Sequence, residues 1–102
     1  DGVMIHSCQK TPDEVYAFLA AFRAAHPATP VVVVPTTYNA ATEAELAAHG
    51  ANIVIHAYHL LRSAFPAMQK TAELTLLHGR TKEADGLCMS IREILSLIPT
   101  EV

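Results

Sequence analysis

Cysteine is scarce in this 102-residue sequence, which contains only Cys8 and Cys88. Two cysteines so far apart form no Cys-x-x-Cys pair and provide no disulfide framework, so we expect reduced thiols. Cys8 lies close to a histidine, but the spacing identifies no base that would make it a nucleophile. Both cysteines are therefore interpreted as small core or loop residues.

A membrane-spanning run and an excess of positive charge are also missing. No apolar run approaches the length that crosses a bilayer, and the amino end lacks the basic stretch of a signal peptide. The formal net charge is −3 and 17% of the residues are charged, which indicates neither a polyanion-binding surface nor a disordered chain. We expect a cytoplasmic protein that binds neither nucleic acid nor membranes.

Three short apolar runs without polar alternation stand out in what is present. They cover residues 3–5, 31–34 and 51–56, and such runs are typical of strands buried in a parallel sheet. Helical patterns over residues 12–25 and 42–48 separate them. This alternation predicts right-handed crossovers and an α/β fold.

Three Ser/Thr-x-x-Glu patterns predict where helices begin. They occupy residues 11–14, 42–45 and 90–93, and each has the residue types of a capping box, in which the first side chain and the glutamate cap each other's backbone N–H groups. In the first pattern Pro12 also stands at the expected first helical position.

The last part of the chain is predicted to be helical. A short helix over residues 59–64 should end before Pro66, because proline breaks or kinks a continuous helix. A longer helix is expected over residues 66–78, followed by a polar link at 80–86 and a last helix over about 90–97. Apolar residues spread around much of the longer helix, so either another subunit or the last helix should cover it.

The chain reads as part of a larger domain. Three parallel strands leave two open sheet edges, and the sequence has no initiator methionine. A start in a strand and a helical end fit the last part of a (β/α)₈ barrel, with about five strands expected upstream. On this reading residues 1–65 hold the last three strands and helices of the barrel, and residues 66–102 form a terminal helical segment.

His6 and Ser7 follow the first predicted strand. Ligands bind at the carboxyl ends of strands in parallel α/β folds, whether the sheet is open or closed. From position alone, His6 is either a catalytic group or a hydrogen-bonded structural histidine.

Four segments carry a resemblance to a known family. They are residues 3–7 (Val-Met-Ile-His-Ser), 31–38 (Val-Val-Val-Val-Pro-Thr-Thr-Tyr), 53–62 and 90–94. Together they resemble the carboxyl-terminal part of the phosphoenolpyruvate mutase family, within the isocitrate lyase superfamily, over essentially the whole chain. The Val-Pro-Thr-x-Tyr run is similar to the branch that holds the mutases and the phosphonopyruvate hydrolases. The sequence departs from that pattern at His56 and Tyr58, where relatives tend to have an aromatic residue and asparagine.

The resemblance implies the interconversion of phosphoenolpyruvate and phosphonopyruvate, in which a phosphoryl group moves between the enol oxygen and the methylene carbon of pyruvate enolate. The hydrolase alternative passes that group to water. The resemblance also implies that the strands are the sixth to eighth of the barrel, that Mg²⁺ is the cofactor, and that a terminal helix is exchanged between subunits of dimers that pair into tetramers.

The resemblance assigns His6 as the catalytic and substrate-binding histidine near the transferring group. Ser7 is a second substrate-binding candidate, or a residue that only holds the strand end. No metal ligand is assigned within this chain, because the family's metal-binding acids and its gating loop would precede Asp1.

Three alternatives remain at this point. His56 and His59 could form a metal cluster with His6, although their spacing is common by chance. Arg62 could contact an anion, but an arginine in a first helical turn is more often solvated. The chain could also be a non-catalytic assembly segment, in which the terminal helices matter and the strands are scaffold.

Overall fold

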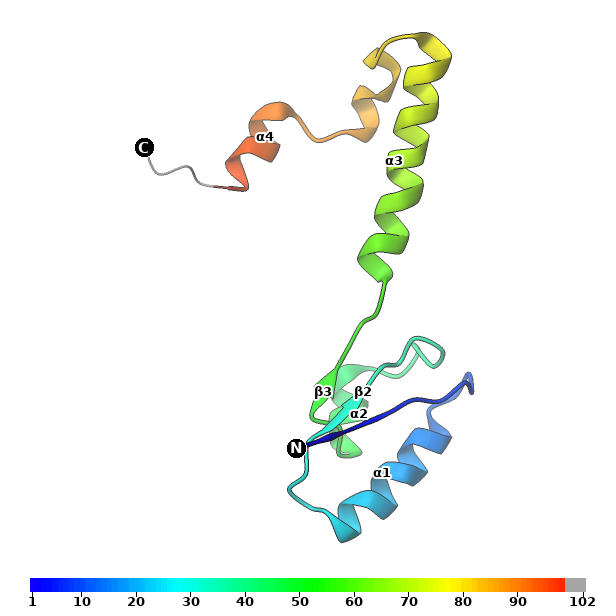
Figure 1. The fold of residues 1–102 in the computed structure, drawn as a ribbon, viewed down its shortest axis with the longest axis vertical. Helices are drawn as coiled ribbons and strands as arrows, with labels where there is room; N and C mark the ends of the chain where they lie inside the picture. The colour runs from blue at the N-terminus through cyan, green and yellow to red at the C-terminus, as the bar shows by residue number, and fades with distance from the viewer. Residues whose placement is uncertain (99–102) are drawn as a thin grey trace. The chain divides into compact units, whose positions relative to one another are not determined.

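The computed structural model describes residues 1–98. The chain forms two compact units, the first spanning Asp1–Ala57 and the second beginning at Tyr58 (Figure 1). The predicted boundary at 65/66 lies inside a helix of the second unit, and residues 99–102 of the predicted terminal segment lie outside the described residues. Within residues 1–98, no helix combines the length and apolar character needed to cross a membrane.

The first unit is built on a parallel sheet of three strands in the order β1-β2-β3. The strands are β1 (Val3–Ile5), β2 (Val31–Val33) and β3 (Ile53–Val54). Val3 pairs with Val31, and Val32 pairs with Ile53. The predicted parallel α/β arrangement is confirmed, although β3 is shorter than the predicted strand over residues 51–56.

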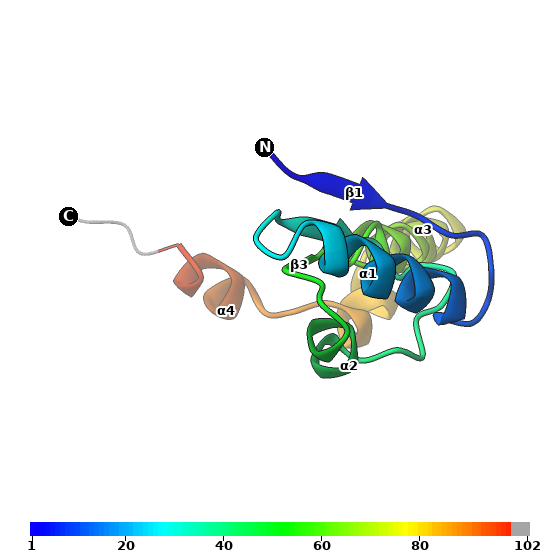
Figure 2. The ribbon, with the colours of Figure 1, turned by 90° about the horizontal axis from the view of Figure 1, so that it is seen from below.

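One face of this sheet is covered by α1 (Asp13–Ala25) and α2 (Glu43–Ala48), which lie against the strands (Figure 2). The buried core of the unit consists of Val15, Leu19, Val31, Val33, Tyr38, Leu46 and Ala51. The other face is open in this chain, because Met4 and Ile53 on it are 62% and 51% exposed. Side chains alternate between faces along a strand, so the buried and open positions follow from the register.

Two of the three predicted capping boxes are confirmed, and they begin α2 and α4 (Ile91–Ser96). The Thr42 hydroxyl accepts from the Glu45 N–H at 3.2 Å, and the Glu45 carboxylate accepts from the Thr42 N–H at 2.8 Å. Ser90 and Glu93 repeat this geometry at 3.1 and 3.0 Å. The pKa values of Glu45 and Glu93 lie below their usual range. The hydrogen bond that each carboxylate accepts from the backbone N–H of the capping residue is the main cause, and the bond with that residue's side chain is the second.

The third predicted capping box, at the start of α1, is wrong. Pro12 occupies the N-cap position and no side chain caps the helix. The Thr11 hydroxyl donates instead to the Asp13 carboxylate at 3.0 Å, and Glu14 accepts from Ser7. A buried serine hydroxyl needs a hydrogen-bond acceptor. The hydroxyl of Ser7 donates to Glu14, so this carboxylate does not cap the backbone as the local pattern predicted.

The predicted helix break at Pro66 is also wrong. Helix α3 runs without interruption over His59–His78, with Pro66 inside it. Proline removes the donor to the carbonyl of Arg62, four residues earlier. No residue of α3 is buried in this chain, so water can reach that carbonyl. After α3, the predicted polar link contains a short 3-10 helix, η1 (Lys82–Leu87), whose Ala84 is buried.

Arg23 joins three segments at the amino ends of the strands. From the last turn of α1, its guanidinium donates to the carbonyl oxygen of Gly50 at 2.7 and 3.0 Å and to that of Thr29 at 2.5 Å. It also donates to the carbonyl of His26 at 3.2 Å and to the side-chain oxygen of Asn52. Gly50 has a φ of +109°, and a Cβ there would lie 3.0 Å from Cγ of Arg23. Glycine at position 50 therefore suits both the positive φ and the close approach of the Arg23 side chain.

Replacing Arg23 by alanine should lower the free energy of unfolding by roughly 2–4 kcal/mol, because several charge-assisted hydrogen bonds are lost together. The measurement is denaturant or thermal unfolding of the protein that contains this chain. Lys10→Ala, at an exposed cation of the same unit, is the control and should change stability by less than about 0.5 kcal/mol. Equal effects of the two substitutions would contradict the assigned role of Arg23.

Candidate functional site

The carboxyl ends of β1 and β2 lie side by side, because the strands are parallel and Ile5 pairs with Val33. His6 and Ser7 follow β1, and Thr36, Thr37 and Tyr38 follow β2 by a few residues. The Thr37 hydroxyl donates to the carbonyl oxygen of Ser7 at 2.7 Å. Two of the four segments that carry the family resemblance are thus hydrogen-bonded to each other.

His6 is exposed and continues the open face of the sheet. Strand alternation places it on the face of Met4, opposite to the helices. Its imidazole has no hydrogen-bond partner among residues 1–98. Both ring nitrogens are therefore available to a ligand at this end of the sheet.

Ser7 lies on the helix-covered side and is 4% exposed. Its hydroxyl donates to the Glu14 carboxylate at 2.5 Å and accepts from the Gln9 N–H at 3.1 Å. The only proton of this hydroxyl and one of its two acceptor sites are thus used within the protein. These contacts hold the end of β1, and the direct substrate contact of Ser7 stays a prediction.

Tyr38 belongs to the loop that follows β2, and its side chain is part of the buried core of the first unit. It is 1% exposed, and its hydroxyl has no hydrogen-bond partner within residues 1–98. Burial raises the pKa of this hydroxyl, and the nearby Tyr16 raises it further. The ring stabilises the core by packing, while the unpaired hydroxyl opposes that stabilisation.

Tyr38→Phe should leave stability unchanged or raise it by up to about 1 kcal/mol, because phenylalanine keeps the ring and removes the unpaired hydroxyl. The check is thermal unfolding of the variant beside the wild type. A loss of more than about 1 kcal/mol would show that the hydroxyl has a partner in the complete protein.

The structure does not assemble the alternative metal site. Among residues 1–98 no three His, Cys, Asp or Glu side chains come together in a way that could hold a metal ion. His56 pairs with Glu43 at 2.7 Å, and both side chains are mostly exposed. His59 belongs to the second unit. Arg62 is exposed in the first turn of α3. Both cysteines are free and exposed outside the helices and strands, which agrees with the loop alternative of the prediction.

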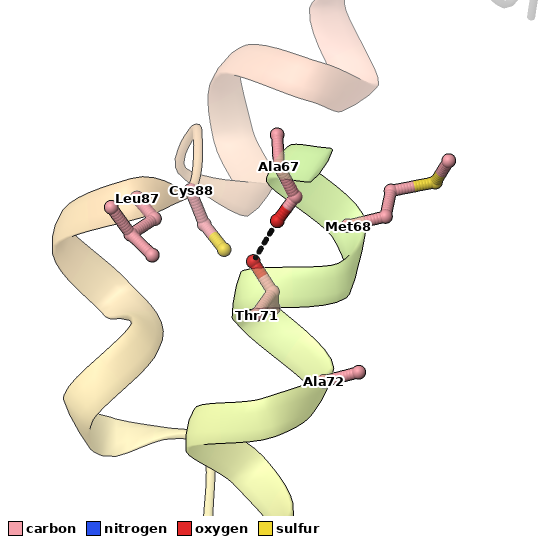
Figure 3. Close-up of a pocket in the computed structure, with 6 residues that line it drawn as sticks. All are labelled: Ala67, Met68, Thr71, Ala72, Leu87 and Cys88. Atoms are coloured by element: carbon pink, nitrogen blue, oxygen red, sulfur yellow. Dashed lines mark hydrogen bonds between the residues drawn. The ribbon is translucent and has the colours of Figure 1, made fainter. Parts of the chain in front are cut away.

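The second unit has an open apolar groove of about 420 Å³ between α3 and η1 (Figure 3). It is lined by Ala67, Met68, Thr71, Ala72, Leu87 and Cys88. The Thr71 hydroxyl is used within the helix, where it donates to the Ala67 carbonyl at 3.1 Å. The groove offers apolar surface and one thiol, and it lacks the converging polar groups of a catalytic pocket. No sequence pattern indicated it.

Known proteins resemble this chain over most of its length. The family model described as phosphoenolpyruvate phosphomutase matches residues 1–76. The chain belongs to this family. It is 38% identical over 98 residues to phosphonopyruvate hydrolase of Variovorax sp. (strain Pal2), covering 95% of this chain and 33% of that protein. It is 34% identical over 101 residues to phosphoenolpyruvate phosphomutase of Streptomyces viridochromogenes, covering 99% and 31%.

Solved structures agree with these sequence relatives. The phosphoenolpyruvate phosphomutase of Streptomyces platensis subsp. rosaceus matches with a TM-score of 0.81 and 38% identity, over 95% of this chain and 33% of that one. A phosphonopyruvate hydrolase in complex with oxalate and Mg²⁺ matches with a TM-score of 0.78 and 38% identity, over 95% and 34%. The chain spans about a third of the length of these relatives. The predicted fold class, part of a (β/α)₈ barrel, is confirmed.

In a (β/α)₈ barrel the two ends of the sheet have different roles. Active sites of such barrels lie at the carboxyl ends of the strands, where His6 and the loop after β2 stand. The sequence predicts His6 at this end of the sheet, but it did not predict the roles of Glu14 and Thr37, whose hydrogen bonds hold Ser7. The available signal for Thr37 was a pair of threonines in the loop after β2. Glu14 was obscured by its position in an apparent capping box.

Proposed function

We propose that the protein containing this chain is a phosphoenolpyruvate mutase, which interconverts phosphoenolpyruvate and phosphonopyruvate. Membership of the family supports the reaction class. The observation that carries the proposal is the exposed His6 at the carboxyl end of β1, whose imidazole has no hydrogen-bond partner within residues 1–98. The phosphoryl group would move between the enol oxygen and the methylene carbon of pyruvate enolate, so that one P–O bond is exchanged for one P–C bond.

His6 would act by donating a hydrogen bond near the transferring group. Phosphoryl transfer passes through a loose transition state whose charge lies on the phosphoryl oxygens. A donor held in place before the reaction stabilises that charge without reorganisation. The exposure of His6 on the open face of the sheet supports its access to substrate.

Mg²⁺ is proposed as the cofactor, since one structural relative is a complex with oxalate and Mg²⁺. The residues of this chain do not fit a magnesium site: the described part of the chain, residues 1–98, brings no three acidic, His or Cys side chains together. We propose that the ligands lie outside this segment, and the role of His6 does not depend on them.

Phosphonopyruvate hydrolysis is the second candidate. The curated hydrolase is 38% identical to this chain, whereas curated mutases are 34–35% identical. A solved mutase reaches the same 38%. In the hydrolase reaction the phosphoryl group passes to water, and the same histidine could stabilise the same charge.

Phosphorus NMR of the full protein with phosphonopyruvate and Mg²⁺ separates the candidates. Formation of phosphoenolpyruvate supports the mutase, and formation of inorganic phosphate supports the hydrolase. The segment of residues 1–102 alone serves as a control. Absence of conversion by the full protein would contradict both enzymatic proposals and favour the assembly-segment alternative.

His6→Ala in the full protein should lower kcat about 10²–10³-fold, because one preorganised donor to the transition state is lost. Folding should be retained, since the side chain is exposed. The matched control is His26→Ala, an exposed histidine before β2, at the opposite end of the strands. Steady-state kinetics and circular dichroism check this. Equal activity of the two variants would contradict a catalytic role for His6.

We also propose that the terminal segment, residues 66–102, is exchanged between neighbouring subunits of a dimer or tetramer. Large apolar side chains on α3 are exposed in this chain, among them Leu76 and Leu77 at 84% and 76%. A helix this apolar is normally covered.

We propose a reducing, cytoplasmic compartment for the protein, and the two free, exposed cysteines support this proposal.

Leu76→Glu combined with Leu77→Glu should dissociate the assembly, because two charges would be buried in an apolar interface. Sedimentation velocity of the full protein measures this. Lys70→Glu, an exposed residue of the same helix, is the control and should leave the assembly intact. A wild-type monomer, or an unchanged assembly in the double variant, would contradict the proposal.

A further inference from the structure

We propose that Glu14, Ser7 and Thr37 are positioning residues that set the direction of His6 for phosphoryl transfer. The proposal rests on the function proposed above and adds three residues that do not themselves touch the substrate. It follows from how the two segments after β1 and β2 are fixed to each other and to α1.

The first link joins the loop after β1 to the start of α1. The Ser7 hydroxyl, 4% exposed, donates to Glu14 at 2.5 Å and accepts from the Gln9 N–H at 3.1 Å. A carboxylate is also favoured in the first turn of a helix, where the N–H groups carry positive partial charge. Glu14 therefore lies in a stable position from which it fixes Ser7.

The second link joins the same residue to the neighbouring strand. Thr37 donates its hydroxyl proton to the main-chain carbonyl of Ser7 at 2.7 Å. The last paired residues of the two strands are Ile5 and Val33, so this contact continues the connection beyond the sheet. These contacts fix the carboxyl ends of β1 and β2 relative to each other.

His6 lies between these constraints. On its amino side, Ile5 is fixed by the ladder to β2, and on its carboxyl side, Ser7 is fixed by Glu14 and Thr37. The imidazole has no hydrogen-bond partner of its own among the described residues 1–98, so its direction depends on the backbone at both sides. A displacement of about 1 Å in a reacting group can cost as much as a hundredfold in rate.

Glu14→Ala in the full protein should lower kcat for conversion of phosphonopyruvate in the presence of Mg²⁺ about tenfold, with KM changed less than about twofold. Asp13→Ala is the matched control: it removes a carboxylate from the same helical turn, one whose partner is Thr11 at 3.0 Å, and it should keep wild-type kinetics. Glu14→Gln, which retains an acceptor oxygen, should restore most of the rate. Thr37→Val should behave as Glu14→Ala does, and Thr37→Ser should restore the rate.

The decisive experiment combines Ser7→Ala with His6→Ala. If Ser7 acts through His6, Ser7→Ala lowers kcat about tenfold in the wild type and has no further effect in the His6→Ala background. Multiplying losses would overturn the proposal, because they would mean that Ser7 contributes independently.

The outcomes separate this proposal from the function on which it rests. No conversion by the wild-type protein would overturn the proposed function. Conversion that depends on His6, together with Glu14→Ala kinetics equal to those of Asp13→Ala, would leave the function in place and overturn the positioning role.

Discussion

Successive residues of a strand project to opposite faces of its sheet, and the candidate site depends on this constraint. At the end of β1 it separates His6, on the open face, from Ser7, which is 4% exposed beneath the helices. Two adjacent residues thus acquire different environments. One keeps its polar atoms available, and the other uses them to join β1, α1 and the loop after β2. Had the strand shifted by one residue, the serine would face the open side and the histidine would be buried.

The two ends of the sheet are stabilised by different chemistry. At the amino ends, the single guanidinium of Arg23 binds main-chain carbonyls from two loops. At the carboxyl ends, hydroxyl groups make the connections and a histidine stays exposed. This division matches the general pattern of (β/α)₈ barrels, in which the carboxyl-terminal face carries activity and the opposite face carries stability.

Much of the fold could be predicted because its signals are local. Runs of apolar residues predicted the strands, and the capping boxes at Thr42 and Ser90 depend on residues only three apart. The predicted capping box at the start of α1 was wrong because the carboxylate of Glu14 accepts a hydrogen bond from the buried Ser7, which lies outside the helix. The continuity of α3 through Pro66 was missed because solvent access to its backbone is a property of the folded chain. His6 could be found from a strand end, whereas the contact between Ser7 and Thr37 joins residues 30 positions apart and no local pattern reports it.

The partners of Arg23 have a consequence for the behaviour of the protein in acid. Each acceptor is a main-chain carbonyl or the amide of Asn52, and neither kind of group gains a proton in the pH range where proteins unfold. These acceptors differ in this respect from a carboxylate, which loses its negative charge in acid and with it most of its attraction for a guanidinium. Acidification therefore weakens the first unit through contacts other than the hydrogen bonds of Arg23.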